Sequence, residues 1–249
     1  MIALIDGDLV AYRCSASAEN DGVEIAVTRC DRLMQDILAV TTADSYRVFL
    51  TGGNNFRKDI DPEYKANRKD TIPPQYLQQC REHLVVNWKA EVCDGHEADD
   101  ALGVAQVSAW HIPVEEAVEE TIICSLDKDL LQIPGKHYRW QIGTSKWTKE
   151  AELLNVDYLA GLRSFYISSL VGDKSDNVRG VDGIGKVRAD KALIGAETEQ
   201  EMFDTCRILY NDDERYFRNV KLLWIWREEN DIFDPVKRGL IELDTSTDS

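Results

Sequence analysis

The chain has 249 residues, of which 43% are hydrophobic, so it is long enough to bury the core of one large domain or of a domain with a helical extension. No apolar run approaches the roughly 20 residues that cross a bilayer, and two aspartates interrupt the apolar N-terminus, unlike a signal peptide. We therefore expect a cytoplasmic protein with no membrane partner. The net charge of −16 is unusual for a protein that binds nucleic acid, unless the acids lie away from it or gather where divalent cations neutralise them.

Cysteine and histidine give no sign of a zinc site or of covalent catalysis. The chain has six cysteines but no CxxC pair, and its four histidines lack a zinc-ligand spacing. The sequence has no GxSxG nucleophile elbow. We expect reduced, buried thiols at Cys14, Cys30, Cys80, Cys93, Cys124 and Cys206.

Strand and helix signals alternate through the first 140 residues. Short apolar runs predict buried parallel strands, and apolar residues at helical spacing between the first two runs predict a βαβ unit. The alternation predicts an α/β sheet flanked by helices. The expected strands are residues 2–6, 46–50 and 121–125, and the expected helices are residues 26–40, 75–86 and 98–110.

Strand signals mostly vanish after residue 150, so we expect the C-terminal third to be helical. Trp224 and Trp226 stand two positions apart, which would place them on different faces of a helix. Both are therefore expected in the core and not at a partner site. The expected helices are residues 155–171, 186–195, 198–210 and 212–228.

Residues 52–75 fit neither a strand nor a helix. This segment is polar, carries five basic residues and ends at Pro73 and Pro74, and it is too long for an ordinary connection. Such loops are functional or disordered. Phe56 and Tyr64 stand among the basic residues, which favours contact with nucleic acid over a bland linker.

Carboxylates collect at the predicted ends of strands and at the start of a helix. Asp6 ends the first strand, and Asp127 and Asp129 follow the third, so they would share one edge of a parallel sheet. Singly, such an acid is more often a helix N-cap or a solvated charge. Together these acids would repel one another without cations. The set is Asp6, Glu97, Asp99, Asp100, Asp127, Asp129, Asp173 and Asp176.

An all-oxygen ligand set without histidine or cysteine selects magnesium or manganese. Two such ions, about 3.5 to 4 Å apart, activate a water molecule and stabilise the pentavalent phosphate in phosphodiester hydrolysis. The acids therefore predict a nuclease that uses two or more Mg²⁺ ions, for which Mn²⁺ would substitute.

A glycine-rich stretch, GVDGIGKVRADKAL at residues 180–193, runs into a predicted basic helix. Its glycines allow a tight turn, and the free N–H groups of a helix N-terminus can bind an anion. We expect contact with the DNA backbone and no reading of sequence. A nucleotide-binding P-loop is disfavoured, because its spacing is absent and no strand precedes the stretch. The residues expected to contact DNA are Gly180, Gly183, Gly185, Lys186 and Arg188.

Five motifs in order resemble the 5′ nuclease family, which includes flap endonucleases and the 5′ nuclease domain of bacterial DNA polymerase I. They lie between residues 2 and about 195, and the small size resembles free-standing phage and bacterial enzymes. The resemblance implies a PIN-like, Rossmann-like α/β domain at residues 1–155 with a helical arch at about 52–75. It also implies a helical region at residues 156–249 with a helix-three-turn-helix motif at about 172–195. The motifs are LIDGDLVAYR, PEYKANR, GHEADD, SLDKDLLQI and LVGDKSDNVRGVDGIGKVRA.

The same resemblance implies roles for single residues. Tyr64, Lys65 and Arg68 would lie on the arch beside the 5′ single strand, with Lys65 and Arg68 gripping the scissile phosphate. Asp127 would lie between the two metal ions. Carbonyl groups of the glycine loop, at Val181 and Ile184, would hold a potassium ion against a duplex phosphate. The first metal group would be Asp6, Glu97, Asp99, Asp100 and Asp127, and the second would be Asp129, Asp173 and Asp176.

Two positions depart from the family pattern. Thr51 stands at a strand end where relatives commonly carry an aspartate, so an outer acid is missing. Ser168 and Ser169 stand where relatives often place lysine or glutamine. Both changes bear on metal affinity and on the balance between activities. Asp8, an additional acid, would be an outer residue of the metal site or a turn residue.

The favoured function is hydrolysis of DNA at 5′ ends or 5′ flaps, as an exonuclease, a flap endonuclease or both, in replication or repair. RNA primers in RNA–DNA hybrids are a further expected substrate. We expect a monomer, located in the host cytoplasm if a phage encodes it. A PIN-type ribonuclease would lack the arch and the glycine loop, and a non-catalytic duplex-binding module would lack some of the eight acids, which are all present.

Overall fold

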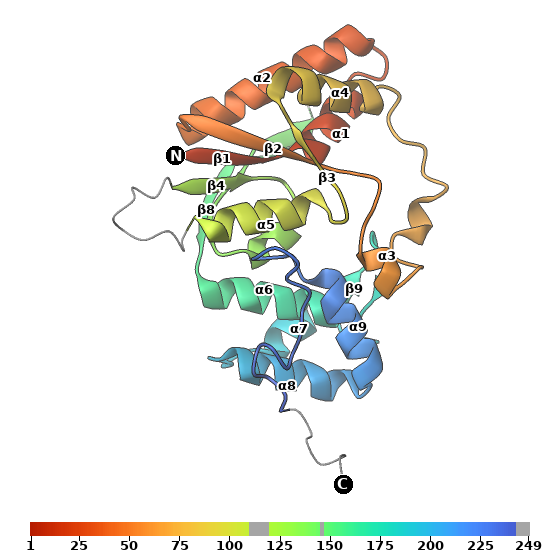
Figure 1. Cartoon of the computed structure of the whole chain (residues 1–249), viewed down its shortest axis with the longest axis vertical. Coiled ribbons are helices and arrows are strands. Elements are labelled where there is room, and N and C mark those ends of the chain that lie inside the picture. The colour runs from red at the N-terminus through yellow and green to blue at the C-terminus, as the bar shows by residue number, and fades with distance from the viewer. Residues whose placement is uncertain (110–119, 145–146, 243–249) are drawn as a thin grey trace.

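The computed structural model describes residues 1–109, 120–144 and 147–242. A central sheet with helices on both faces forms the upper part of the molecule in Figure 1, and a group of helices lies below it. Within the described ranges, no helix is long and apolar enough to cross a membrane.

The central sheet is mostly parallel, as predicted. Its strand order is β3-β2-β1-β4-β5-β8, and among these six strands β8 alone runs antiparallel to its neighbour. The predicted strands are present as β1, β2 and β4, whereas β3, β5 and β8 were not predicted. The strands are β1 (Ile2–Asp6), β2 (Ser45–Thr51), β3 (Glu91–Cys93), β4 (Thr121–Cys124), β5 (Gly135–Arg139) and β8 (Glu152–Val156).

The two faces of the sheet enter separate cores. Ala3 and Ile5 of β1 lie in a core with three helices, whereas Leu4 lies in a second core with one helix, as expected for the alternation of a strand. The first face carries α1 (Gly7–Ser17), α2 (Val23–Thr41) and α4 (Leu77–Trp88), and the second carries α5 (Ala98–Ser108) (Figure 1).

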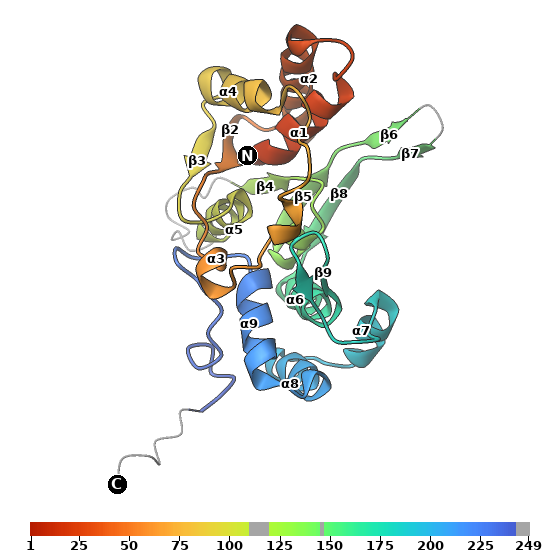
Figure 2. The same ribbon diagram turned by 90° about the vertical axis from the view of Figure 1, so that its right-hand side faces the viewer.

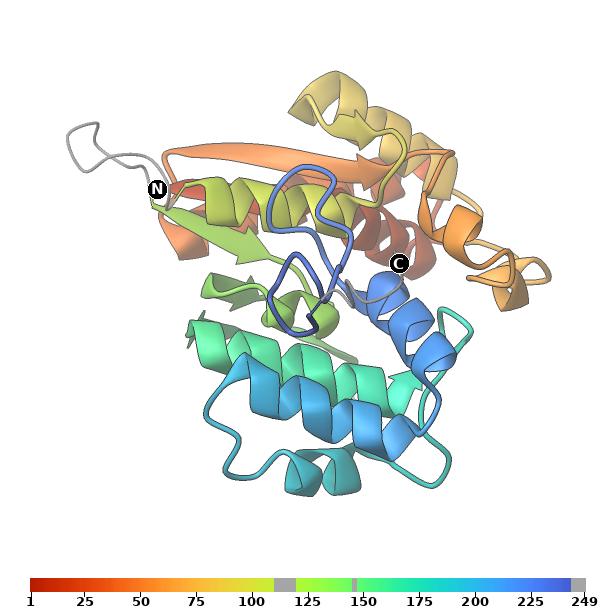
Figure 3. The same cartoon turned by 60° about the horizontal axis from the view of Figure 1, so that its bottom comes forward.

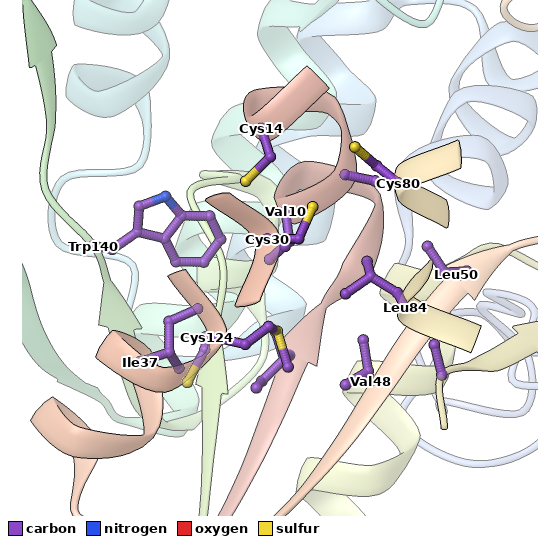
Figure 4. Packing of buried hydrophobic residues seen from close by; sticks show 14 of the residues in the cluster. Val10, Cys14, Cys30, Ile37, Val48, Leu50, Cys80, Leu84, Cys124 and Trp140 are labelled. Atoms are coloured by element: carbon purple, nitrogen blue, oxygen red, sulfur yellow. The ribbon is translucent and has the colours of Figure 1, made fainter. Parts of the chain in front are cut away.

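The first core is rich in thiols. Figure 4 shows Cys14, Cys30, Cys80 and Cys124 among aliphatic side chains and Trp140. All six cysteines are free and buried. The prediction of buried, reduced thiols is therefore confirmed.

Helix α1 was not predicted from the sequence. It starts directly after β1, where Asp6 Oδ1 caps it by accepting a hydrogen bond from Leu9 N at 3.0 Å. Its buried side consists mainly of small residues, among them Val10, Ala11 and Cys14. Small residues give a weak hydrophobic period, which explains why the pattern did not indicate a helix.

Helices dominate the chain after the sheet, as predicted. The helix expected from residue 155 starts at Tyr158, because the residues just before it pair with β5. The helix expected up to residue 228 ends at Leu223, yet Trp224 and Trp226 are buried in the core as predicted. Figure 3 shows α6 and α8 side by side. The helices are α6 (Tyr158–Val171), α7 (Lys186–Ala192), α8 (Glu199–Tyr210) and α9 (Asp213–Leu223).

Two small antiparallel ladders complete the described chain. Strands β6 (Ile142–Thr144) and β7 (Trp147–Lys149) form a ribbon that projects beyond β5 and β8 in Figure 2. Strands β9 (Gly172–Asp173) and β10 (Val178–Arg179) bracket the loop that carries Asp176, and Asp173 ends β9.

The predicted helical arch is not a helical arch in this structure. Between residues 52 and 75, the described helical pieces are α3 (Arg57–Ile60) and the 3₁₀ helix η1 (Ala66–Arg68). Arg57 and Tyr64 are almost fully buried, so the segment packs onto the body of the protein. Buried partners for these two side chains, together with Pro73 and Pro74, keep the segment from continuing as a helix. We call residues 52–76 the covering segment.

Candidate active site

Two neighbouring parallel strands bring Asp6 and Asp127 together. In the pairing of β1 with β4, Ile5 lies opposite Cys124, so both strands end at the same edge. Ser125 Oγ donates a hydrogen bond to Asp6 Oδ2 at 2.7 Å and accepts one from Asp127 N at 3.0 Å. Ser125 thus links the two acids, and sequence reasoning did not single it out.

The N-terminus of α5 directs two further predicted acids into the same cleft. Glu97 is the N-cap residue and Asp99 lies in the first turn, and both line the cleft that Asp6 and Asp127 line. Asn55 Nδ2 donates a hydrogen bond to Glu97 Oε1 at 2.8 Å. The structure therefore brings four of the five acids of the first predicted group together.

Asp100, the fifth member of that group, lies apart from the cleft. Its side chain is 0% exposed and does not line the cleft. Both of its oxygens accept hydrogen bonds from Arg57, at 2.6 and 2.8 Å. Direct metal ligation by Asp100 does not agree with this placement, because a buried arginine already occupies its carboxylate.

Thr51, at the position of the missing acid, fastens the start of α5. Thr51 Oγ1 accepts a hydrogen bond from Ala98 N at 3.0 Å, which satisfies one of the free N–H groups of the helix. Thr51 N donates to Asp8 Oδ2 at 2.9 Å. The other oxygen of Asp8 pairs with Arg81 of α4, and Asp8 lines the cleft. Asp8 therefore lies in the first turn of α1 and lines the cleft from there.

The three acids of the second predicted group lie side by side, since Asp173 contacts the Asp129 side chain and accepts a hydrogen bond from Asp176 N at 3.2 Å. Asp129 N donates a hydrogen bond to Asp127 Oδ1 at 2.8 Å, and Ser168 Oγ lies 3.5 Å from Asp129 Oδ1. Asp173 Oδ1 accepts hydrogen bonds from Ser175 N and Ser175 Oγ, both at 2.6 Å. Asp129 lines the cleft, whereas Asp173 shapes the turn between β9 and β10 and does not line it.

The covering segment folds onto the loop that carries Asp176. Tyr64 Oη donates hydrogen bonds to Asp176 Oδ2 at 2.9 Å and to Glu97 Oε2 at 3.1 Å. Arg68 Nη2 donates to Asp176 Oδ1 at 2.6 Å, and Lys65 pairs with Glu97. Tyr64 is 3% exposed, so the expected contact between its ring and DNA is not available here. The hydroxyl of Tyr64 bonds to Glu97 and Asp176, and this contact keeps the ring inside the protein.

Asparagines that sequence reasoning missed fasten the covering segment at this loop. Asn67 Nδ2 donates a hydrogen bond to Lys174 O, and Asn177 Nδ2 donates one to Glu63 O, both at 2.8 Å. No sequence signal identifies these contacts, because the two asparagines bond to backbone groups 107 and 114 residues away in the chain.

The glycine loop forms the expected tight turn before α7. Gly183 has a φ of +74°, which favours glycine. A Cβ atom on Gly180 would approach the backbone of Val171 to 2.3 Å, so no larger residue fits. The carbonyl of Val181 accepts a hydrogen bond from Ile184 N at 3.1 Å. Gly185 is the N-cap of α7, and Lys186 and Arg188 lie in its first turn.

Burial and mutual repulsion raise the pKa values of the central acids. Burial, together with the charges of Asp8 and Asp127, raises the pKa of Asp6 to about 7. Burial and the charge of Asp127 likewise raise the pKa of Asp129 to about 7. The pKa of Asp99 is raised well above its usual value by burial and by the nearby acids. Holding all these groups charged requires a counter-charge.

The pKa of Glu97 is shifted in the opposite direction, below its usual value. Burial alone would raise its pKa, but the positive charges of Lys65 and Arg57 outweigh burial and lower it. Two basic residues of the covering segment therefore keep Glu97 charged without a metal ion.

The cleft has a volume of about 810 Å³. Within the ranges that the structure describes, no three His, Cys, Asp or Glu side chains are arranged closely enough to enclose one ion. Mg²⁺ keeps several of its waters and uses one or two carboxylates, so spaced acids with raised pKa values fit such ions. Acids lining the cleft are Asp6, Asp8, Glu97, Asp99, Asp127, Asp129 and Asp176, and basic residues lining it are Arg57, Lys58, Lys65, Arg68 and Lys69.

Residues 1–158 match the family model described as the 5′-3′ exonuclease, N-terminal resolvase-like domain. The chain belongs to this family. The resemblance stated from the five motifs is therefore confirmed, and the matched residues contain the edge of the sheet where Asp6 and Asp127 meet. The mostly parallel sheet agrees with this membership.

Curated relatives include bacterial DNA polymerases. The chain is 32% identical over 209 residues to DNA polymerase I of Chloroflexus aurantiacus, which covers 75% of the chain and 21% of the relative. It is 25% identical over 237 residues to a 5′-3′ exonuclease of Buchnera aphidicola, which covers 88% of the chain and 78% of the relative. The chain thus spans about a fifth of the length of the polymerase relatives it matches.

Solved structures with a similar fold include the flap endonuclease of bacteriophage T5, crystallised as a pseudo-enzyme-product complex with DNA and metal ions. That match has a TM-score of 0.65 and 19% identity, and covers 89% of this chain and 88% of the other. A T5 5′-exonuclease with bound zinc gives a TM-score of 0.66 at 19% identity, with the same coverage of both chains. These likenesses establish the fold, which is the PIN-like arrangement expected from the motifs.

Proposed function

We propose that this chain is a structure-specific 5′ nuclease that hydrolyses DNA phosphodiesters with two divalent metal ions. One observation carries the proposal: seven acids line one cleft, and the basic covering segment lines it with them. Acids with raised pKa values fit divalent cations, and the basic residues fit a phosphate backbone. The same arrangement explains how a chain of net charge −16 would approach DNA.

The acids divide naturally into those that would hold the ions directly and those that support them. Asp6, Asp99 and Asp127 would hold the first ion, in part through its coordinated water molecules, and Asp127 would be shared with the second. Asp129 and Asp176 would hold the second ion, with Asp173 beside them. When bound, Mg²⁺ lowers the pKa of a coordinated water and stabilises negative charge on the phosphate.

Basic residues of the covering segment would position the DNA. Lys65 and Arg68 line the cleft on the side of Asp176, where they would contact the scissile phosphate and the 5′ strand. Both now pair with acids, at Glu97 and Asp176, so they would exchange these partners for phosphate oxygens when DNA binds. The Tyr64 hydroxyl, which contacts both Glu97 and Asp176, would keep these two carboxylates in their orientation.

Product mapping with three DNA substrates tests the proposed activity. Labelled 5′-flap, nicked and blunt duplexes are incubated with the chain and Mg²⁺. A ladder of mononucleotides indicates exonuclease action, and one product near the junction indicates flap cutting. Loss of cleavage in the Asp127→Ala variant is expected, and Mg²⁺-dependent cleavage that survives this change would contradict the two-metal assignment. An equivalent duplex with an RNA 5′ end tests primer removal.

We further propose that the glycine loop binds the duplex through backbone groups and a potassium ion near Val181 and Ile184. Gly183 and the free N–H groups at the start of α7 support a contact with phosphate. Duplex binding measured in EDTA should persist, and it should be stronger in potassium chloride than in lithium chloride of equal concentration. Equal binding in both salts would remove the potassium ion from the proposal.

We also propose that the chain is a monomer. Light scattering of the same samples tests this.

A further inference from the structure

Arg57 and Asp100 form a buried ion pair behind the cleft. The Arg57 side chain is 2% exposed and the Asp100 side chain is 0% exposed. The two groups meet through two hydrogen bonds, from Nη1 to Oδ2 at 2.6 Å and from Nη2 to Oδ1 at 2.8 Å. This two-point contact fixes the orientation of both side chains.

The remaining hydrogen-bonding capacity of Asp100 is also used. Its Oδ2 accepts a hydrogen bond from Glu97 N at 3.0 Å, and its Oδ1 accepts one from Trp226 N at 3.2 Å. A carboxylate has about four lone-pair positions, and all four have donors here. No oxygen of Asp100 is left to bind a metal ion.

The remaining N–H groups of Arg57 donate hydrogen bonds to backbone carbonyls at the end of α9. Its Nε donates to Leu222 O at 2.8 Å and its Nη2 donates to Trp224 O at 2.7 Å, where α9 ends. The Arg57 guanidinium also lies over the ring of Phe56, which stacks on Trp226. Arg57 is therefore fixed by charge, by backbone carbonyls and by packing together.

Three parts of the candidate active site meet at this pair. Arg57 lies near the start of the covering segment, which carries Lys65 and Arg68. Asp100 lies in the first turn of α5, which carries Glu97 and Asp99. The carbonyl partners belong to the end of α9, and α9 also contacts the first residue of the glycine loop, because Arg215 Nη2 donates to Gly180 O. The pair therefore joins the covering segment, the first turn of α5 and the end of α9.

We propose that Arg57 and Asp100 are positioning residues, and that Asp100 is not a metal ligand. The pair holds the covering segment and the N-terminus of α5 in register, so that Glu97 and Lys65 face the same cleft. This inference rests on the proposed nuclease function for its activity readout, while its stability and metal-binding readouts are independent of that function.

A mutant cycle separates the two roles of Asp100. The variants are Arg57→Gln, Asp100→Asn and the double variant, with Arg47→Gln as a control. Arg47 forms a comparable two-point pair with Glu91, but both side chains are about half exposed and away from the cleft. Mn²⁺ binding is followed by the signal of free Mn²⁺ in electron paramagnetic resonance, thermal unfolding is followed in EDTA, and cleavage is followed on a 5′-flap duplex.

If Arg57 and Asp100 are positioning residues, both single variants should unfold at a lower temperature and should cleave the flap roughly 10²-fold more slowly. Their effects should be less than additive in the double variant, because each single change strands a buried charge and the double change removes both. Direct ligation by Asp100 predicts a different result: Asp100→Asn would weaken Mn²⁺ binding, whereas Arg57→Gln would free the ligand and strengthen it. Opposite shifts in Mn²⁺ affinity would overturn the proposal.

A milder variant covers the case in which a buried pair cannot be broken without unfolding. Arg57→Lys keeps the charge but cannot make the two-point contact. It should fold, retain Mn²⁺ binding and lose much of the cleavage rate. Full cleavage by Arg57→Lys would overturn the positioning role. If the native chain cleaves no flap, the nuclease function fails, and the unfolding and Mn²⁺ measurements still decide the role of the pair.

Discussion

Tyr64 and Asp176 are 112 residues apart in the chain, and the Tyr64 hydroxyl donates a 2.9 Å hydrogen bond to Asp176 Oδ2. The same hydroxyl reaches Glu97. One buried phenol thus joins the covering segment, the loop between β9 and β10, and the start of α5. Burial and these two acids raise the pKa of Tyr64, so the hydroxyl stays a donor.

Replacement of Tyr64 by phenylalanine tests this role. The change removes the one phenol proton that the two carboxylates share, and a hydrogen bond to a charged group contributes about 1.5 to 3 kcal/mol. We expect Tyr64→Phe to unfold several degrees lower in EDTA, with cleavage reduced and duplex affinity little changed. The exposed Tyr12 provides the control, since Tyr12→Phe should leave the unfolding temperature unchanged. Lower duplex affinity at unchanged stability would instead support direct contact with DNA.

Stability should depend on pH and Mg²⁺ together. Asp6 and Asp129 have pKa values of about 7, above the usual 3.8, so the folded chain binds more protons than the unfolded chain between these values. Stability in EDTA should therefore fall as the pH rises toward 7 and level off above it. Mg²⁺ binds the charged carboxylates, so it should raise the unfolding temperature more at about pH 8 than at about pH 5.5. Thermal scans at both pH values measure this, and an equal Mg²⁺ effect would contradict it.

The charge of Asp127 should lower the stability of the metal-free protein, although the proposed cleavage requires it. Its charge raises the pKa values of Asp6, Asp99 and Asp129. The Asp127→Asn variant should therefore unfold at a higher temperature in EDTA and lose Mg²⁺-dependent cleavage. Glu19→Gln, which changes an exposed acid between α1 and α2, should alter neither property. A less stable Asp127→Asn variant would show that Asp127 serves the fold.

Thr51 should serve the fold through its hydroxyl group. Thr51→Val leaves Ala98 N without its acceptor, and the loss of such a cap costs about 1 kcal/mol. In a chain of this length, that lowers the unfolding temperature by about 2 to 4 °C. Thr51→Ser keeps the hydroxyl and should unfold near the native temperature. Thermal unfolding of both variants measures the difference, and equal unfolding temperatures would show that the hydrogen bond contributes nothing.

The two glycines before α7 should differ in their tolerance of alanine. Gly183 has a φ of +74°, whereas Gly185 has a φ of −95° and no atom within 4 Å of an added Cβ. Gly183→Ala costs about 1 kcal/mol of strain, and a shifted loop should weaken duplex binding in EDTA by about fivefold. Gly185→Ala should bind like the native chain. Fluorescence anisotropy with a labelled duplex compares them, and equal affinities would argue that the loop does not contact DNA.

The sequence alone was sufficient for the three central strands of the sheet, β2, β1 and β4, for the acids at their edge and for the family. Asp6 and Asp127 follow apolar runs directly, and parallel strand ends meet at one edge whatever the details of packing. The glycine loop was equally readable, because its turn depends on residues that are adjacent in the chain. These features are local or follow from the alternation of strands and helices.

Only the tertiary structure decided what each polar side chain contacts. Asp99 and Asp100 are neighbours in sequence, but adjacent residues of a helix point about 100° apart, so one faces the cleft and the other faces Arg57. The rotation of α5 against the sheet chooses between them, and that rotation is set by packing. Tyr64 and Arg57 looked like exposed residues of a polar loop, and their burial depends on partners far away in the chain. The sequence therefore determined which groups gather at this edge, whereas long-range packing determined which of them are free to bind metal and DNA.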